Sequence, residues 1–295
     1  MAPEQDRGGQ PSTKRQLAMS WNKDDLISTF KQTPQLKPDG FAVTGFVFPP
    51  VHPVAYVKFG LLSERRAELR NHEYAFKALK AMPQNQTQGI IIPEVYRSFE
   101  YGERLFIIME YIPGRTLEQL VQQPGWESQQ PSVSNEIARA IKLLMSIKPP
   151  PGQKPGPVRG GQIRHPLFKD NTSYLEYNSI DELEEHLNKV STLRFKDSPT
   201  VRLERKLCFY YSDFFAGNFI FTDSGDLCII DFDQAGFLPE SFMMFALADS
   251  SWYPALWIKD ILGLPQDNLE AMRNMFYWFT IGVAYIGKLQ NPSAL

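Results

Sequence analysis

Three polar side chains stand at the ends of apolar runs in the second half of the chain. Asp213 follows the run 207–211, Asn218 comes five residues later, and Asp231 ends the run 227–230. One Asp and Asn pair is typical of a solvated turn, but three residues in strand-end positions favour a common site. Carboxylates and carboxamides are the oxygen ligands that Mg²⁺ binds, and a carboxylate can also deprotonate an attacking hydroxyl. The spacing therefore favours transfer of a phosphoryl group from a nucleotide with its metal ion.

The segments around these residues must position them, and their composition predicts short strands. Residues 207–211 are apolar and predict a buried strand, whereas 219–221 and 227–230 are β-rich runs joined by a Thr-Asp-Ser-Gly-Asp turn. This pattern is typical of a hairpin. Cys208 and Cys228 lie within these strands and are expected to be buried free thiols, since they show no metal-binding spacing.

The chain of 295 residues is long enough for a large domain or two lobes, and 43% of its residues are hydrophobic. A net charge of −2 predicts neither nucleic-acid binding nor attraction to an anionic membrane. Residues 275–286 are too few for a transmembrane span of about 20 apolar residues. The first 18 residues hold no apolar core of a secretory signal, so a cytoplasmic setting is expected.

Two motifs around the three polar residues resemble a known family. They read S-D-F-F-A-G-N-F at 212–219 and I-I-D-F-D-Q-A-G-F-L-P at 229–239. Both are similar to the catalytic core of the aminoglycoside phosphotransferase and choline kinase branch of the protein kinase-like fold, and especially to fungal proteins with an aminoglycoside phosphotransferase domain. The resemblance implies Asp213 as catalytic base and Asn218 and Asp231 as metal ligands. It also implies ATP and Mg²⁺ as cofactors and a small-molecule hydroxyl as acceptor.

The same resemblance predicts an α+β, two-lobed protein kinase-like fold. Residues 21–112 would form an N-terminal lobe with an antiparallel sheet and a helix, where the nucleotide binds. Residues 113–295 would form a mainly helical lobe with the catalytic hairpin and the substrate pocket. The polar residues 1–20 are expected to be a disordered tail.

A lysine and a helical glutamate match the ion pair that orients the phosphate-binding lysine in this fold. Lys58 lies in the β-rich run 54–59, and residues 65–81 have helical spacing with Glu68 and Glu73 on them. The resemblance implies Lys58 and Glu73, with Glu68 as the second choice. Two plainer interpretations stay open: a lysine that protects an edge strand from aggregation, and a glutamate on a solvated helix face.

Residues 109–117, M-E-Y-I-P-G-R-T-L, resemble the hinge that connects the two lobes in this family. The resemblance implies that backbone groups of Glu110 and Ile112 bind the adenine edge. The Pro- and Gly-rich stretch 149–166 predicts a long loop within the second lobe. Its Arg159, Arg164 and His165 are either solvated or in contact with an anionic substrate.

The chain departs from the family pattern around the catalytic aspartate. The family has a histidine two residues before it, and here Tyr211 holds that position, so its hydroxyl is expected to hydrogen-bond the backbone near Asp231. Phe214 and the pair 215–216 replace the usual Leu and His-Pro. A kinase-shaped interaction protein without activity therefore stays an alternative. Protein phosphorylation is disfavoured, since no A-P-E-like element follows Asp231.

Overall fold

The computed structural model describes residues 13–37, 40, 42–193 and 195–280. Contacts within the chain divide it into two compact units. The first unit contains the described residues up to Arg65 together with Pro93–Ile112, and the second contains Arg66–Ile92 and the described residues from Pro113 onward. The division after Ile112 coincides with the predicted lobe boundary. Residues 66–92, which the sequence places in the N-terminal lobe, group with the second unit.

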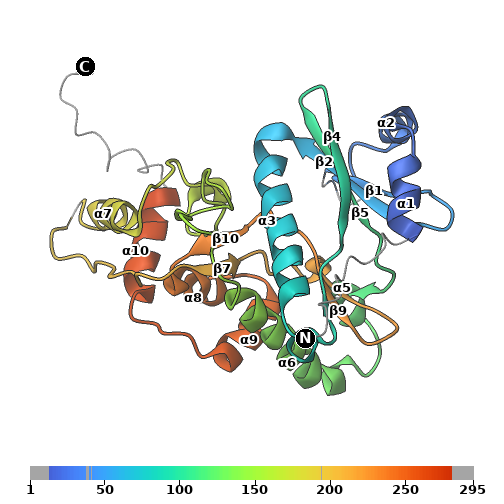
Figure 1. Ribbon diagram of the computed structural model, residues 1–295. Coiled ribbons are helices and arrows are strands. Elements are labelled where there is room, and N and C mark those ends of the chain that lie inside the picture. Colours follow the sequence, from blue (N-terminus) through green and yellow to red (C-terminus); the bar gives the residue numbers. More distant parts are fainter. Residues whose placement is uncertain (1–12, 38–39, 41, 194, 281–295) are drawn as a thin grey trace, which may run out of the picture. The chain divides into compact units, whose positions relative to one another are not determined.

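The first unit is built on an antiparallel sheet of four strands. These strands are β1 (Gly45–Phe48), β2 (Ala55–Leu61), β4 (Val95–Tyr101) and β5 (Arg104–Glu110). They lie in the order β1-β2-β5-β4, so β2 and β5 are the internal strands (Figure 1). The internal strands β2 and β5 are mostly buried, whereas β4 buries only Tyr96 and Phe99, which lie three positions apart, with a register shift between Val95 and Arg97.

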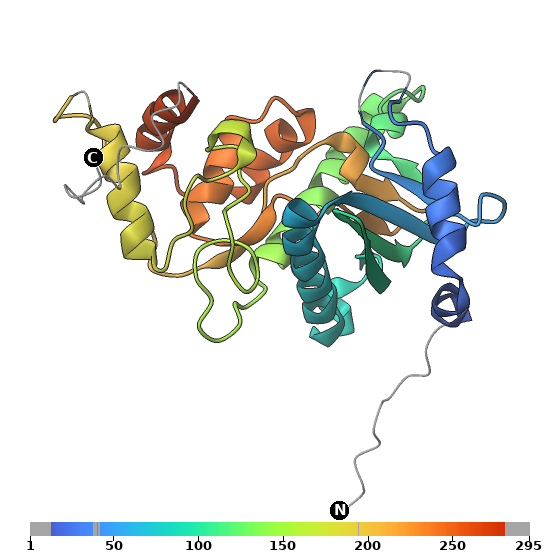
Figure 2. The same cartoon turned by 90° about the horizontal axis from the view of Figure 1, so that it is seen from above.

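Two helices, α1 (Thr13–Ser20) and α2 (Lys23–Gln32), belong to the same unit and lie beside this sheet (Figure 2). Asn22 begins α2, because its side chain accepts a hydrogen bond from the Asp24 N–H, as an N-cap should. The helices and strands share one apolar cluster. Its buried members are Ala18, Leu26, Ala55, Val57, Phe59, Tyr96, Phe99, Phe106 and Ile108.

The prediction of a disordered tail over residues 1–20 is wrong for the part that the structure describes. Helix α1 occupies 13–20, and Ala18 is fully buried. Arg15 Nη1 lies 2.6 Å from Glu94 Oε1, and Lys14 Nζ lies 3.2 Å from Glu110 Oε1. These partners are about 80 to 95 residues away along the chain, so the polar composition of the segment could not indicate them.

The second unit is mainly helical. Its helices are α3 (Leu62–Ala81, which begins in the first unit), α4 (Gln84–Thr87), α5 (Leu117–Leu120), α6 (Trp126–Met145), α7 (Ile180–Ser191), α8 (Glu240–Ala248), α9 (Tyr253–Leu262) and α10 (Leu269–Thr280), with the 3₁₀ turns η1 (Lys169–Asn171) and η2 (Ala216–Asn218). Among the described residues, no helix combines the length and the apolar character that crossing a membrane requires.

Two small sheets complete the second unit. Their strands are β3 (Ile90–Ile91), β6 (Arg115–Thr116), β7 (Cys208–Tyr211), β8 (Phe219–Phe221), β9 (Leu227–Ile229) and β10 (Ala235–Leu238). One sheet has the order β3-β9-β8-β6 and the other pairs β10 with β7. The predicted hairpin is confirmed, because β8 and β9 are antiparallel neighbours. Both cysteines are free, as predicted; Cys228 is buried as expected, whereas Cys208 is only partly buried.

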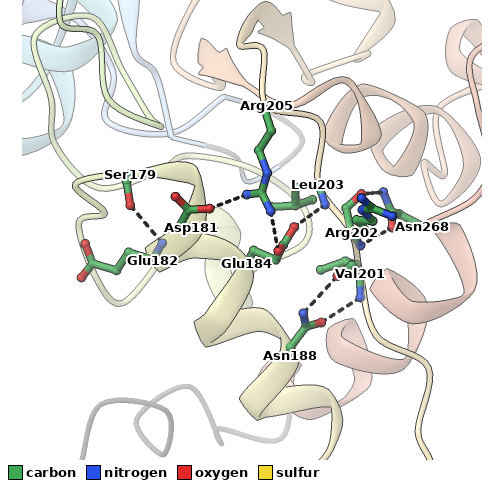
Figure 3. Close-up of polar contacts among 10 residues, drawn as sticks. All are labelled: Ser179, Asp181, Glu182, Glu184, Asn188, Val201, Arg202, Leu203, Arg205 and Asn268. Atoms are coloured by element: carbon green, nitrogen blue, oxygen red, sulfur yellow. Dashed lines mark hydrogen bonds and ion pairs between the residues drawn. The ribbon is translucent and has the colours of Figure 1, made fainter.

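The segment that leads into β7 is held by side-chain amides (Figure 3). Asn188 of α7 bonds both the N–H and the C=O of Val201, at 2.7 and 3.0 Å, and Asn268 does the same for Arg202, at 2.8 and 3.0 Å. Figure 2 shows α7 beside α10, and Asn274 of α10 donates a 2.9 Å hydrogen bond to Ser191 Oγ of α7. The backbone groups of this irregular segment thereby gain side-chain hydrogen-bond partners, which buried peptide groups require.

Candidate active site

The three residues with predicted chemical roles lie at the ends of neighbouring elements in the second unit. Asp213 is the second residue after β7, Asn218 ends η2, and Asp231 is the second residue after β9. Strand β7 pairs with β10, and the Ser212 N–H extends this pairing with a 2.9 Å bond to Gln234 O. The segment around Asp213 and the segment after Asp231 are therefore hydrogen-bonded neighbours.

Asn218 links the two aspartates. Its Nδ2 donates to the backbone oxygen of Asp213 at 3.3 Å, and its own backbone oxygen accepts from the Ile230 N–H at 3.1 Å. Asn218 is buried, whereas Asp213 is partly exposed. The Asp213 Oδ1 accepts the N–H of Phe215 at 3.2 Å, which orients the carboxylate. The structure thus brings Asp213, Asn218 and Asp231 together, as their spacing predicts.

Tyr211 holds the backbone next to Asp231. Its hydroxyl donates to the Ile230 oxygen at 2.7 Å, directly before Asp231. Burial raises the pKa of Tyr211 well above its usual value of 10, and the charges of Asp213 and Asp231 raise it further. The hydroxyl is therefore a permanent donor. The prediction that Tyr211 replaces the family histidine by bonding the backbone near Asp231 is confirmed.

Asp231 adopts a left-handed backbone conformation with φ 61°. Such a conformation is uncommon for a residue other than glycine, and it is held only where the surroundings define it. The next side chain, Phe232, is fully buried and lies 5.6 Å from the Tyr211 ring, centroid to centroid. The Tyr211 hydrogen bond and the Phe232 ring therefore fix the chain on both sides of Asp231.

Asn71 of α3 is a further residue of this site, and the sequence analysis missed it. It is fully buried, and its Nδ2 donates to Ala235 O at 2.7 Å and to Phe232 O at 3.3 Å. Its Oδ1 accepts the Val158 N–H at 2.9 Å. One amide thus connects α3, the segment after Asp231 and the loop 149–166. The only sequence signal is an Asn within the helical stripe that turns out to be buried.

The loop 149–166 is anchored and is neither free nor solvated throughout. Arg164 Nη2 lies 2.6 Å from Asp233 Oδ2, and both side chains are largely buried. His165 is fully buried, so the two interpretations of it, a solvated residue or a substrate contact, are both wrong. Arg159 is exposed in a left-handed conformation, with φ 67°. Arg164 pairs with only one oxygen of Asp233, since Oδ1 is buried without a hydrogen-bond partner among the described residues.

The bulky residues beside Asp213 diverge. Phe214 is fully buried, 6.4 Å from the Tyr211 ring, and so adds to the core. Phe215 is partly exposed and lies against Trp252 at 4.9 Å. Phe214, which departs from the family pattern, packs within the apolar interior. Phe215, which also departs from it, is partly exposed, and its backbone lies next to the Asp213 carboxylate.

Lys58 lies in the first unit and is 6% exposed. Its strand β2 pairs with β1 through Gly45 and with β5 through Ile107, so it is an internal strand. The interpretation of Lys58 as an edge-strand lysine is therefore wrong. Its predicted contact with nucleotide phosphates stays a prediction.

The two glutamates of α3 differ sharply. Glu73 has a side chain 44% exposed, 3.7 Å from Lys77, which fits the solvated helix face that was left open for it. Glu68 is 1% exposed and belongs to the buried stripe of α3 with Asn71, His72, Ala75 and Leu79. A buried carboxylate requires a compensating partner. Burial favours Glu68 over Glu73 as the helical glutamate of the predicted ion pair, and its pairing with Lys58 stays a prediction.

The predicted hinge residues end the sheet of the first unit. The Glu110 N–H is donated to Glu94 O at 2.8 Å, so an adenine contact at Glu110 would use the carbonyl. The Tyr111 N–H is donated to Val54 O at 3.1 Å, whereas Ile112 donates none to another described residue. A carbonyl and an N–H two residues apart suit the adenine edge, and this assignment stays a prediction.

The oxygen ligands fit a metal ion that arrives with a nucleotide. Among the described residues, no three His, Cys, Asp or Glu side chains converge as a complete metal site. Mg²⁺ seldom uses such a cage, since it keeps several waters and takes one or two carboxylates plus phosphate oxygens. Asn218 donates its Nδ2 to Asp213 O, which turns its oxygen away from that carbonyl. Asn218 and Asp231 therefore suit Mg²⁺ as a partial ligand set.

Comparison with known proteins agrees with this geometry. Residues 62–274 match the phosphotransferase enzyme family, and the protein belongs to that family. Among solved structures, aminoglycoside phosphotransferase APH(4)-Ia is similar, with 13% identity, coverage of 87% of each chain and a TM-score of 0.53. The apo form of its thermostable mutant gives 13% identity, 87% and 89% coverage and a TM-score of 0.52. No curated protein sequence matches. The predicted family and the kinase-like α+β fold are confirmed.

Proposed function

We propose that the protein transfers the γ-phosphoryl group of ATP to a hydroxyl of a small molecule, with Mg²⁺ bound. The observation that supports this proposal most is the hydrogen-bonded connection of Asp213, Asn218 and Asp231 within the second unit. A base and a partial set of oxygen ligands are the groups that phosphoryl transfer requires, because the remaining task is positioning and charge stabilisation.

Each residue has a distinct part in the proposed reaction. Asp213 accepts the proton of the acceptor hydroxyl while the oxygen of that hydroxyl bonds to the γ-phosphorus. The bond between the γ-phosphorus and the bridging oxygen breaks at the same time, and ADP leaves. Asn218 and Asp231 would hold Mg²⁺, which neutralises charge on the phosphate oxygens. Lys58 of the first unit would bind phosphate oxygens with Glu68 as its partner, and Glu110 O with Ile112 N–H would hold the adenine.

A thermal-shift titration tests the nucleotide and metal parts. Wild type and Asp231→Ala are titrated with ATP and GTP, with and without Mg²⁺. Ligand at a hundredfold excess over Kd adds about 2.7 kcal/mol of stability, a shift of a few degrees. We expect an Mg²⁺-dependent shift in wild type that the variant loses. If neither nucleotide shifts wild type, the transfer proposal fails and a kinase-shaped interaction protein becomes the better explanation.

Turnover tests the base. Asp213→Ala removes the proton acceptor and should lower kcat by about 10²–10³, as loss of one transition-state contact typically does. Nucleotide binding in the thermal-shift assay should persist, because Asp213 is not assigned to the metal. An Asp213→Ala variant with the rate of wild type would show that another group is the base.

A further inference from the structure

Phe215, whose backbone N–H orients the candidate base Asp213, also carries an aromatic side chain. The Phe215 N–H donates to Asp213 Oδ1 at 3.2 Å, so the Phe215 side chain departs from the backbone at the edge of the carboxylate. Because Phe214 is fully buried and Phe215 is partly exposed, the chain presents only the second ring on the accessible side.

The Phe215 ring is held in place from two directions. A Cβ at Gly217 would approach Phe215 Cζ to 3.0 Å and Cε1 more closely still, so the ring lies directly on the backbone of Gly217. On another side it meets Trp252, with ring centroids 4.9 Å apart and an interplanar angle of 62°. This edge-to-face geometry is the favourable one for aromatic pairs. We call Phe215 and Trp252 the aromatic corner.

The aromatic corner is not part of the core. Trp252 is 43% exposed; its ring packs on Phe215, and its backbone N–H donates to Ser250 Oγ at 3.1 Å. An exposed tryptophan ring that packs on Phe215 provides an apolar face that a ligand can cover.

The acidic residue nearest to Trp252 along the chain is already paired. Asp249, three residues earlier, is bound by Arg273 Nε, which lies 3.1 Å from each carboxylate oxygen. Its negative charge is thus already paired, and an ammonium group arriving there would meet a guanidinium. Asp213 lies at the corner as well, so the preference for an uncharged, apolar face rests on the two exposed rings and not on the surrounding charge.

We propose that Phe215 and Trp252 determine acceptor specificity and select alcohols whose hydroxyl is carried next to an aromatic or aliphatic face, in preference to polyamine-like alcohols. This inference rests on the proposed transfer from ATP to a hydroxyl at Asp213. The rings bind the apolar part of the acceptor and leave its hydroxyl beside the carboxylate.

The test compares acceptors that differ only in the group beside the hydroxyl. Phenylpropanol and aminopropanol carry the same primary hydroxyl on a three-carbon chain, and a panel of such aryl, alkyl and amino pairs is assayed for ADP release. We expect kcat/KM to favour the aryl and alkyl members by about tenfold, the order of one good aromatic contact. Preference for the amino members, or for choline, would overturn the inference and leave the transfer proposal standing.

Two variants assign the preference to the aromatic corner. Trp252→Ala should raise KM for phenylpropanol by about 3- to 10-fold with little change in kcat, and should leave KM for aminopropanol unchanged. Phe215→Leu keeps an apolar side chain without the ring and should act in the same direction. Tyr277→Ala is the matched control, since Tyr277 is an aromatic residue of the same unit with 58% exposure. Equal effects of Trp252→Ala on both acceptors would contradict the assignment.

Binding without turnover separates the two proposals. Saturation-transfer NMR reports contact between phenylpropanol and the protein, with or without ATP. Binding that Trp252→Ala abolishes, in a protein that turns over no alcohol, would support the aromatic corner and overturn the transfer proposal. Absence of both binding and turnover across the panel would overturn the inference.

Discussion

The Tyr211 hydroxyl donates a 2.7 Å hydrogen bond to the backbone oxygen of Ile230, the residue before Asp231. Tyr211 also lies two residues before Asp213. One buried phenol therefore connects the strand that carries the candidate base to the peptide that carries a candidate metal ligand. Burial raises the pKa of this phenol well above its usual value, so its charge does not change near neutral pH.

Tyr211→Phe removes this bond and leaves a buried carbonyl without its donor. We expect a loss of about 1–3 kcal/mol in the free energy of unfolding, and a weaker Mg²⁺-dependent shift with ATP because Asp231 is less well held. Tyr177→Phe is the control, since Tyr177 is equally buried and its hydroxyl lies 2.7 Å from His186 Nδ1. If both variants respond to Mg²⁺ and ATP as wild type does, Tyr211 is only a structural residue.

Asn71→Leu keeps the branched shape and the number of heavy atoms of the side chain but leaves two carbonyls and one N–H without their partner. The expected loss is about 2–4 kcal/mol in the free energy of unfolding, since each buried group costs about 1–3 kcal/mol and the costs overlap. Hydrogen exchange should also quicken at residues 231–236, next to the lost contacts with Phe232 and Ala235. Unchanged exchange in that segment would mean that α3 does not hold it.

The amide contacts of Figure 3 should matter more than the ion pairs beside them. Asn188→Ala removes both bonds to Val201 and should cost about 1–3 kcal/mol in urea unfolding. Asp181→Ala removes only one partner of Arg205, and the Asp181 side chain is 84% exposed, so no measurable loss is expected. The reverse ranking would show that the charged cluster, and not the amide, holds the segment before β7.

His165 should make stability depend on pH. Its Nδ1 accepts the Leu167 N–H at 3.1 Å and its Nε2 lies 3.0 Å from Phe242 O, an arrangement that only the neutral ring satisfies. Burial lowers the pKa of His165 from 6.5 to about 3. Between these values the unfolded chain binds a proton that the folded chain does not, so stability falls as pH drops from 6.5 towards 3, by at most about 1.4 kcal/mol per unit. His165→Gln should flatten this part of the urea-unfolding profile relative to wild type, and an unchanged slope would contradict the assignment.

The parts of the site that could be predicted are local in sequence. The hairpin and its two ends follow from apolar, β-rich runs and turn composition, and the hydrogen bond of Tyr211 follows from the family resemblance. The choice between Glu68 and Glu73 depends instead on the rotational phase of α3, which its mixed composition does not define. Spacing alone marks both residues as helical, and only packing shows that one is buried.

The parts that could not be predicted are contacts between distant segments. Asn71 bonds groups more than 160 residues ahead, and Arg164 reaches Asp233 across 69 positions. A buried Asn or an ion-paired Arg has the same composition signature as a solvated one, so the sequence predicts the loop 149–166 but not its anchoring contacts. Helix α1 is a similar case, since its partners lie in strands that come much later.

The division of the chain has a consequence for any attempt to dissect the protein. The chain passes from one unit to the other after Arg65, again after Ile92 and a third time after Ile112. The second unit is therefore formed by two separate stretches of the chain. A fragment that starts at Pro113 has neither Asn71 nor β3, the strand that pairs with β9. A single cut yields no self-sufficient half, and reconstitution would require a circularly permuted gene or co-expressed pieces.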